Sequence, residues 1–208
     1  INVDAAGIRP GSKEGRRILF VGRNFVRKGG PLVVQAFTIL RKKYLWSAEL
    51  YLAGAKESDI RDALRERQIR VEEVDWQKIH LLGDLGSEKL TDYYNLCDVF
   101  CMPSYFEAYG LVFAEALTYG LPCIGRDKFA MSEFIEDGCT GRLISGEDAE
   151  ELALDLWEVL QDPKYREEVE RRREWYLREY SWDKVAQRIC SVMEKNERDK
   201  DQYRSAGV

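Results

Sequence analysis

Short, continuously apolar runs recur along the chain, and each is followed by a segment with helical spacing. The first run is RILFVG at 17–22, and five similar runs occupy 48–54, 78–83, 98–104, 121–125 and 140–145. Such runs are typical of parallel strands buried on both faces, and each parallel crossover needs a helix. The pattern predicts an α/β fold, a doubly wound Rossmann-like parallel sheet of about six strands.

Beyond Glu147 the strand pattern stops and three helical patterns follow. We expect a helix starting near Glu147, a second over 162–180, and a third over 181–195. The five tryptophans are scattered along the chain, with Trp157 and Trp182 on apolar stripes of these patterns, and we interpret them as core residues. Residues 196–208 contain almost no apolar side chains and predict a polar tail.

Composition and charge narrow the possible functions. The chain has 37 acidic and 32 basic residues, a net charge of -5, so a nucleic acid is not an expected partner. No run approaches the roughly 18 apolar residues of a membrane span, and no signal-peptide pattern opens the chain, so we expect a cytoplasmic protein. The chain begins with Ile and shows no element before Arg17, which suggests a piece of something larger.

Metal and thiol chemistry find little support. The cysteines form no C-x-x-C pair and lie mostly in apolar runs, so we interpret them as reduced, buried thiols. They are Cys97, Cys101, Cys123, Cys139 and Cys190. The DKD triplet at 199–201 lies in the polar tail, so no metal site is predicted, and His80 lies within an apolar run, as a core imidazole does.

The first loop, GRNFVRKGG at 22–30, carries the cations Arg23 and Lys28. Arg23 and Lys28 follow a strand, at the edge where open α/β sheets bind their ligands, so together they resemble an anion clamp. The loop matches neither the dinucleotide fingerprint nor a P-loop. Taken alone, the loop favours the simpler interpretation that Arg23 and Lys28 are two solvated bases.

The loop after the fourth run leads into the helix of GLVFAEAL. Gly110 permits a close backbone approach, and the free amides of Gly110, Leu111 and Val112 favour an anion such as phosphate. Glu107 and Glu115 lie on either side of this start. Ionised carboxylates accept hydrogen bonds from hydroxyls, which a nucleoside diphosphate sugar carries at both ends, although helix-dipole and capping roles also fit both acids.

Several ordered motifs together resemble the donor-binding half of the group 1 retaining glycosyltransferases of the GT-B fold. They are Arg23 and Lys28 after FVG, the E-x7-E pair Glu107 and Glu115 around Gly110, EAL, YGLPCIG, Glu133 and DGCTGRLI. The opening NVD and Pro10 are similar to that family's inter-domain crossover, which assigns 1–16 to the crossover and 17–180 to the nucleotide-sugar-binding domain.

The resemblance implies a role for each site residue. Arg23, Lys28 and the 110–112 amides bind the diphosphate, and the base is read at the end of the third strand by Gly83, Asp84 and Leu85. Glu115 binds the ribose and Glu107 the donor sugar. Glu107, Arg23 and Lys28 are the catalytic candidates.

The resemblance also implies a donor with UDP, GDP or ADP, no metal or other cofactor, and an acceptor bound by an N-terminal domain that this chain lacks. Any membrane association would then depend on the missing part, and the helix over 181–195 returns toward it. Alone, the chain is expected to bind donor and transfer little. A non-catalytic nucleotide-sugar-binding module and a GT-B-like sugar-nucleotide epimerase remain alternatives. One departure concerns RDKFAMSE, where Phe129 and Met131 replace the small residues usual before the glutamate at 133.

Overall fold

The computed structural model describes residues 3, 7–9 and 14–205, with side chains in these ranges up to Met193. A single six-stranded sheet has the order β3-β2-β1-β4-β5-β6, and every strand pairing is parallel. The strands are β1 (Arg17–Val21), β2 (Glu49–Ala53), β3 (Ile79–Gly83), β4 (Val99–Cys101), β5 (Cys123–Arg126) and β6 (Gly141–Ile144). All six predicted strands and the doubly wound fold class are confirmed.

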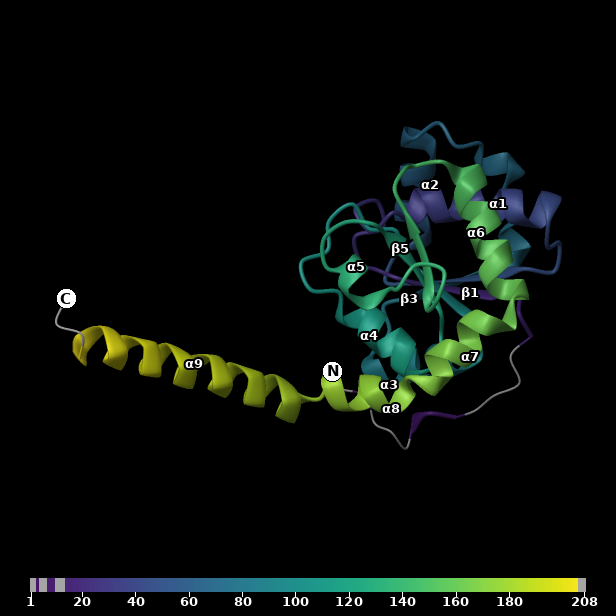
Figure 1. Cartoon of the computed structure of the whole chain (residues 1–208). Helices are drawn as coiled ribbons and strands as arrows, with labels where there is room; N and C mark the ends of the chain where they lie inside the picture. Colours follow the sequence, from purple (N-terminus) through teal and green to yellow (C-terminus); the bar gives the residue numbers. More distant parts are fainter. Residues whose placement is uncertain (1–2, 4–6, 10–13, 206–208) are drawn as a thin grey trace.

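Helices cover both faces of this sheet. They are α1 (Gly30–Lys43), α2 (Glu57–Glu66), α3 (Ser87–Leu96), α4 (Leu111–Thr118), α5 (Met131–Phe134), α6 (Ala149–Gln161), α7 (Pro163–Arg171), α8 (Arg173–Glu179) and α9 (Trp182–Ser205), with short 3-10 turns at Val71–Glu73 and Trp76–Lys78. Figure 1 shows α1, α2 and α6 on one side of the sheet and α3, α4 and α8 on the other. This layering explains why the inner strands β1, β4 and β5 read as apolar runs, since their central residues are buried on both faces, whereas β3 and β6 are partly exposed.

The centre of the sheet is fully enclosed. Ile18, Leu19 and Phe20 are successive residues of β1 and none is accessible to solvent. Ile18 pairs with both Leu50 of β2 and Val99 of β4, so β1 is the central strand of the topology. The chain reverses its direction of winding between β1 and β4, and the loops after these two strands therefore meet at the carboxyl edge of the sheet.

Backbone contacts join these two loops. The Ser104 hydroxyl and the Tyr105 amide both donate to the Arg27 carbonyl, at 3.2 and 2.9 Å. Gly29 has a φ of 80°, and a Cβ at this position would lie 2.4 Å from the Pro103 carbonyl oxygen. Glycine is needed there for both its dihedral angle and its size. The first loop is thus held against the second before any ligand binds.

The C-terminal helices differ from the sequence prediction. The segment 162–180 forms two helices, α7 and α8, which meet at Arg172. The change of direction brings α8 onto α4, where the Arg173 guanidinium donates to the Thr118 carbonyl at 3.2 Å. Periodicity alone cannot show such a bend, because both halves keep the same helical spacing.

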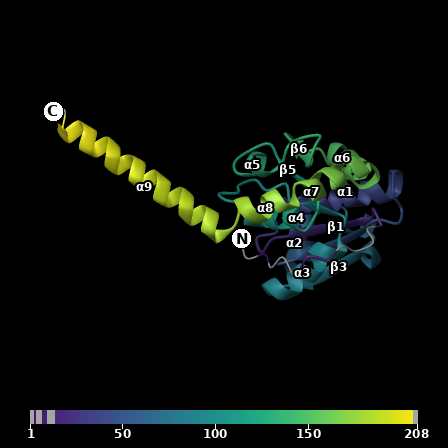
Figure 2. The same ribbon diagram turned by 60° about the horizontal axis from the view of Figure 1, so that its bottom comes forward.

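α9 projects from the body of the protein as a single long helix (Figures 1 and 2). It continues to Ser205, so the segment predicted as a polar tail is helical as far as that residue, and 206–208 lie outside the described residues. Trp182, Ile189 and Met193 are exposed along it. The prediction that the tryptophans are core residues is therefore wrong for Trp182, and also for Trp46 and Trp175, which are exposed. Trp157 on α6 is partly exposed and packs on Tyr44.

Other sequence predictions have mixed outcomes. Cys97, Cys101 and Cys123 are buried cysteines, whereas Cys139 is half-buried and Cys190 is exposed. His80 lies on β3, at the edge of the sheet formed by the described residues, and it is partly exposed although its ring stacks on Tyr51, so it is not the core imidazole that was predicted. None of the described helices is long and apolar enough to cross a bilayer. Asn2, Asp4 and Pro10, which suggested the crossover, lie outside the described residues.

Candidate functional site

Lys28 lies across the end of β1. Its stem packs over Gly22, where a Cβ would come within 2.8 Å of the Lys28 Cγ, so the absence of a side chain at 22 leaves room for the lysine. The ammonium forms an ion pair with Glu107 of the second loop. The two side chains are 14% and 13% exposed. The pair therefore links the two loops in a largely water-excluded position.

Glu107 also contacts the start of α4. Gly110 precedes this helix with a φ of 73°, a left-handed conformation that glycine adopts without strain. Its amide donates to Glu107 Oε1 at 3.3 Å, while Oε2 faces Lys28. The structure thus brings Lys28, Glu107 and Gly110 together. The amides of Leu111 and Val112 follow as the first turn of α4 and have no acceptor within the helix.

Arg23 lies in the same loop as Lys28 but points elsewhere. Its Nε donates to Asp84 Oδ1 at 3.2 Å, just beyond β3. Backbone hydrogen bonds connect the ends of these strands, with Gly54 N donating to the Gly83 carbonyl at 2.7 Å. Arg23, Asp84 and Leu85 line a small hollow at this edge of the sheet. The structure therefore places Arg23 with the residues predicted to read the base, apart from the Lys28–Glu107 pair.

Glu115 lies in the second turn of α4 and faces α3. The Tyr94 hydroxyl donates to its Oε2 at 3.1 Å, and the Tyr94 ring stacks on Tyr119. Burial raises the pKa of the Glu115 carboxyl above its ordinary value, although the hydrogen bond from Tyr94 opposes this effect. Burial, with Glu115 close by, raises the pKa of Tyr94 well above its ordinary value. Glu115 is thus a carboxylate held by a neutral hydroxyl.

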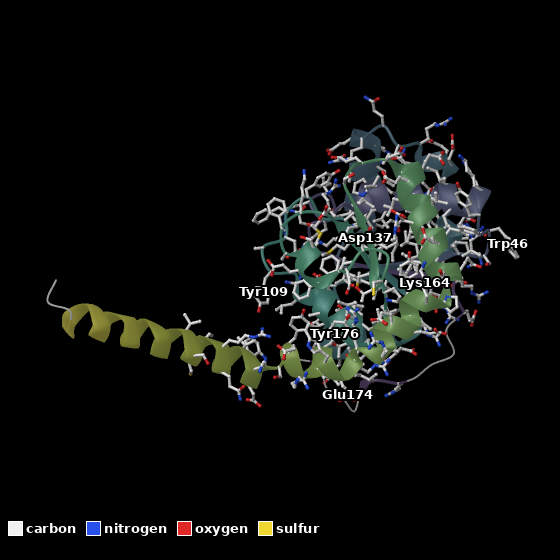
Figure 3. All side chains as sticks on the ribbon, in the orientation of Figure 1. Trp46, Tyr109, Asp137, Lys164, Glu174 and Tyr176 are labelled. Atoms are coloured by element: carbon white, nitrogen blue, oxygen red, sulfur yellow. The ribbon has the colours of Figure 1, made fainter. Side chains whose placement is uncertain are left out.

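The two residues that depart from the family pattern lie at the start of α5, with Phe129 in the preceding loop and Met131 as the first residue of the helix. Met131 is buried, and its sulfur accepts from the Arg126 amide at 3.4 Å. Phe129 is half-exposed and its ring contacts Phe106. Glu133 lies on α5 beside Tyr109, and both line a hollow of about 250 Å³ against α8 and α9. Figure 3 labels Tyr109 at the outer rim of this region.

Sequence reasoning missed two residues that support the second loop. Arg126 ends β5 and is buried; its guanidinium donates to the Gly146 carbonyl at 2.7 Å and lies over the Tyr105 ring. Arg27 donates to the Phe106 carbonyl at 2.7 Å. An arginine at the end of an apolar strand was the available signal for Arg126. Nothing in the local sequence marks Arg27.

Metal-binding groups are not assembled in the described part of the chain. Among residues 3, 7–9 and 14–193, no three His, Cys, Asp or Glu side chains are placed to hold one ion. Asp199 and Asp201 of the DKD triplet lie where side chains are not described.

The sheet order and the site at its switch point define a Rossmann-like nucleotide-binding domain of the α/β class. Comparison with known protein families identifies the family of this domain. The family model described as "Glycosyl transferases group 1" matches residues 9–175. The chain belongs to this family.

Relatives and solved structures agree with this assignment. The phosphatidyl-myo-inositol mannosyltransferase of Mycolicibacterium smegmatis is 28% identical, over 88% of this chain and 46% of its own length. The sucrose-phosphate synthase of Thermosynechococcus elongatus superposes with a TM-score of 0.73 at 25% identity, covering 89% of this chain and 46% of that one. The pneumococcal O-GlcNAc transferase, solved with UDP and GlcNAc, superposes with a TM-score of 0.69 at 23% identity. The match covers 87% of this chain and 36% of that one.

These structural neighbours are GT-B glycosyltransferases, so the predicted fold family is confirmed. The chain spans about half the length of the curated relatives it matches.

Proposed function

We propose that this chain is the donor-binding half of a retaining glycosyltransferase, and that a nucleoside diphosphate sugar binds at the carboxyl edge of its sheet. The observation that carries the proposal is the Lys28–Glu107 pair at the start of α4. It places a cation, a carboxylate and the amides of Leu111 and Val112, which have no acceptor within α4, at the switch point of a doubly wound sheet. Ligands of such sheets bind in this position.

The diphosphate is assigned to Lys28, Arg23 and the amides of 110–112. An ammonium has three donors, so Lys28 can bind phosphate oxygens while it keeps its contact with Glu107. The start of α4 adds backbone donors and a favourable dipole. Arg23 is free to join them because its pair with Asp84 is exposed. In the transfer reaction these groups stabilise the charge that develops on the leaving diphosphate.

The hydroxyl-bearing ends of the donor are assigned to the acids. Glu115 accepts from the ribose and Glu107 from the transferred sugar, next to the bond that breaks. The base lies by Gly83, Asp84 and Leu85, in the hollow that Arg23 also lines. The site requires no metal in this assignment, because the cations and amides balance the diphosphate.

A second domain binds the acceptor. The curated relatives are about twice as long as this chain, and α9 carries an exposed apolar stripe beyond the body of the domain. We assign that stripe, formed by Trp182, Ile189, Val192 and Met193, to contact with the second domain. The 208-residue chain is then expected to bind donor nucleotide but to transfer sugar slowly or not at all.

A binding panel tests the proposal. The chain is heated with UDP, GDP and ADP without metal, and one of the three should raise its unfolding temperature. Lys28→Ala should abolish that shift. Lys42→Ala is the matched control, because Lys42 lies near the end of α1, at the opposite edge of the sheet, and should leave the shift intact. No shift with any of the three nucleotides would overturn the donor-site assignment.

A further inference from the structure

Phe129 has an unfavourable backbone conformation and an exposed side chain. Its φ is 58°, in the left-handed region that a bulky residue rarely adopts, and its side chain is 51% exposed. Glycine would fit this conformation without strain. The residue therefore costs folding free energy at a position where burial recovers little of it. Strain of this kind, held by the surrounding structure, is a feature of functional sites.

The neighbours of Phe129 show that the loop itself is well anchored. Ala130 and Met131 are buried immediately after it, and the Ser132 hydroxyl donates to the Phe129 carbonyl at 3.2 Å. The backbone is thus fixed by other residues, and the phenyl ring is not needed to hold the loop. A structural role for the ring is correspondingly weak.

The ring points toward the second loop of the site. It meets Phe106 edge to face, with ring centroids 5.0 Å apart, and Phe106 is itself 50% exposed. Phe106 directly precedes Glu107, and the Ala130 amide donates to the Glu107 carbonyl at 3.4 Å. Phe106 and Phe129 are therefore the sequence neighbours of Glu107 and Ala130, whose backbones are hydrogen-bonded to each other beside the residue assigned to the transferred sugar. Both aromatic residues remain about half exposed.

We propose that Phe106 and Phe129 form an aromatic wall of the donor-sugar subsite, on which the apolar C–H face of a hexose ring packs. A hexose presents hydroxyls at its edge and C–H groups on its faces. Glu107 is suited to bind the hydroxyls, and the aromatic pair is suited to pack on the C–H groups. Ligand pockets commonly combine apolar walls with a few polar groups in this way. This inference rests on the proposed function, because it places the sugar at Glu107.

The chain also has exposed aromatic residues that serve as a contrast. Trp46 is 77% exposed in the turn after α1, and Figure 3 shows it on the far side of the body from Tyr109. It has no part in the two loops. Phe129 differs from Trp46 in both its strained backbone and its proximity to Glu107.

Calorimetry on the 208-residue chain tests the wall. The nucleotide that binds in the panel is compared with its glucose, N-acetylglucosamine and mannose conjugates. Phe129→Gly should weaken the best-bound conjugate by about fivefold and leave the nucleotide itself within about twofold. Phe129→Tyr should retain most of the conjugate affinity, and Trp46→Gly should change neither. The unfolding temperature of Phe129→Gly should be at least that of the unmodified chain.

Other results would overturn the wall. The proposal is wrong if Phe129→Gly binds every conjugate as tightly as the unmodified chain does. That result would instead favour contact of Phe106 and Phe129 with the second domain. Equal losses for nucleotide and conjugate, with a lower unfolding temperature, would indicate a structural role. Phe106→Ala, at an unstrained position, should reproduce the selective loss if the wall exists. Failure of every nucleotide to bind would refute the proposed function, and this inference with it.

Discussion

Two cations of the loop after β1, Lys28 and Arg23, have opposite surroundings. Lys28 and Glu107 are 14% and 13% exposed, whereas Arg23 and its partner Asp84 are 83% and 70% exposed. Both pairs join the loop after β1 to another strand end. The first pair is enclosed by the two loops of the switch point, and the second lies in solvent above β3.

The difference shows how a single loop can provide both a fixed and a mobile cation. Removing one partner of a buried pair leaves an uncompensated charge, so Lys28 is held where it is. An exposed pair contributes about 0–1 kcal/mol and is screened by salt, so Arg23 can leave Asp84 at little cost. An arriving diphosphate would thus find Lys28 in place and recruit Arg23.

Loss of the fixed cation should have the largest effect. Lys28→Met keeps the stem over Gly22 but leaves Glu107 without its cation. We expect the free energy of unfolding to fall by about 2–3 kcal/mol, below the range for fully enclosed pairs. Nucleotide affinity should fall by about a hundredfold or more. Urea denaturation and calorimetry measure the two effects.

A double variant separates the two roles of Lys28. Adding Glu107→Gln removes the orphaned charge, so Lys28→Met with Glu107→Gln should recover part of the lost stability but none of the nucleotide affinity. If the two stability effects simply added, the pair would not be coupled, and the contrast with Arg23 would lose its basis.

The sequence indicated much of this arrangement. All six strands could be located because their short apolar runs are each followed by a segment with helical spacing, and Gly110 marked the start of α4. Topology then places Arg23, Lys28 and Glu107 at one edge of the sheet. The pairing of each cation could not be predicted, since the direction of a loop side chain depends on dihedral angles that spacing does not encode.

Longer-range features were also beyond the sequence pattern. Arg126 supports the second loop from β5 through the Gly146 carbonyl and the Tyr105 ring, contacts that join three separate segments. The Phe106–Phe129 contact likewise joins residues from two loops. The exposure of Trp182 depends on the direction in which α9 leaves the domain. The apolar stripe in the sequence of α9 shows only that one face of the helix is hydrophobic.

Loss of the mobile cation should affect binding without affecting the fold. Arg23→Ala is expected to change the free energy of unfolding by less than about 0.5 kcal/mol, as is usual for an exposed residue. Nucleoside diphosphate affinity should fall by about tenfold, with a smaller salt dependence than in the unmodified chain. Titrations at two salt concentrations measure both. A stability loss comparable to that of Lys28→Met would contradict the distinction between the pairs.

Glu115 sharpens the comparison, because it is a largely buried acid beside a hydroxyl and not a cation. Burial raises its pKa above the ordinary 4.5, so the folded state binds this proton more tightly than the unfolded state. Its contribution therefore favours folding below pH 4.5 and is lost as the pH rises through the folded pKa. Glu115→Gln should gain stability relative to the unmodified chain between pH 4 and 7. A constant difference in urea denaturation across that range would refute this.

The smallest effect on nucleotide affinity should come from removing the ion-pair partner of Arg23 before the ligand binds. Asp84→Asn removes the charge that Arg23 faces at 3.2 Å, and the pair is so exposed that the fold should not respond. If Arg23 moves to the diphosphate on binding, the unmodified chain must first break the Arg23–Asp84 ion pair. Asp84→Asn has no such pair to break, so its affinity for the nucleotide should be about twofold higher. The gain should disappear in the Arg23→Ala background. A gain that persists there would mean that Asp84 repels the diphosphate directly and that Arg23 does not move to it.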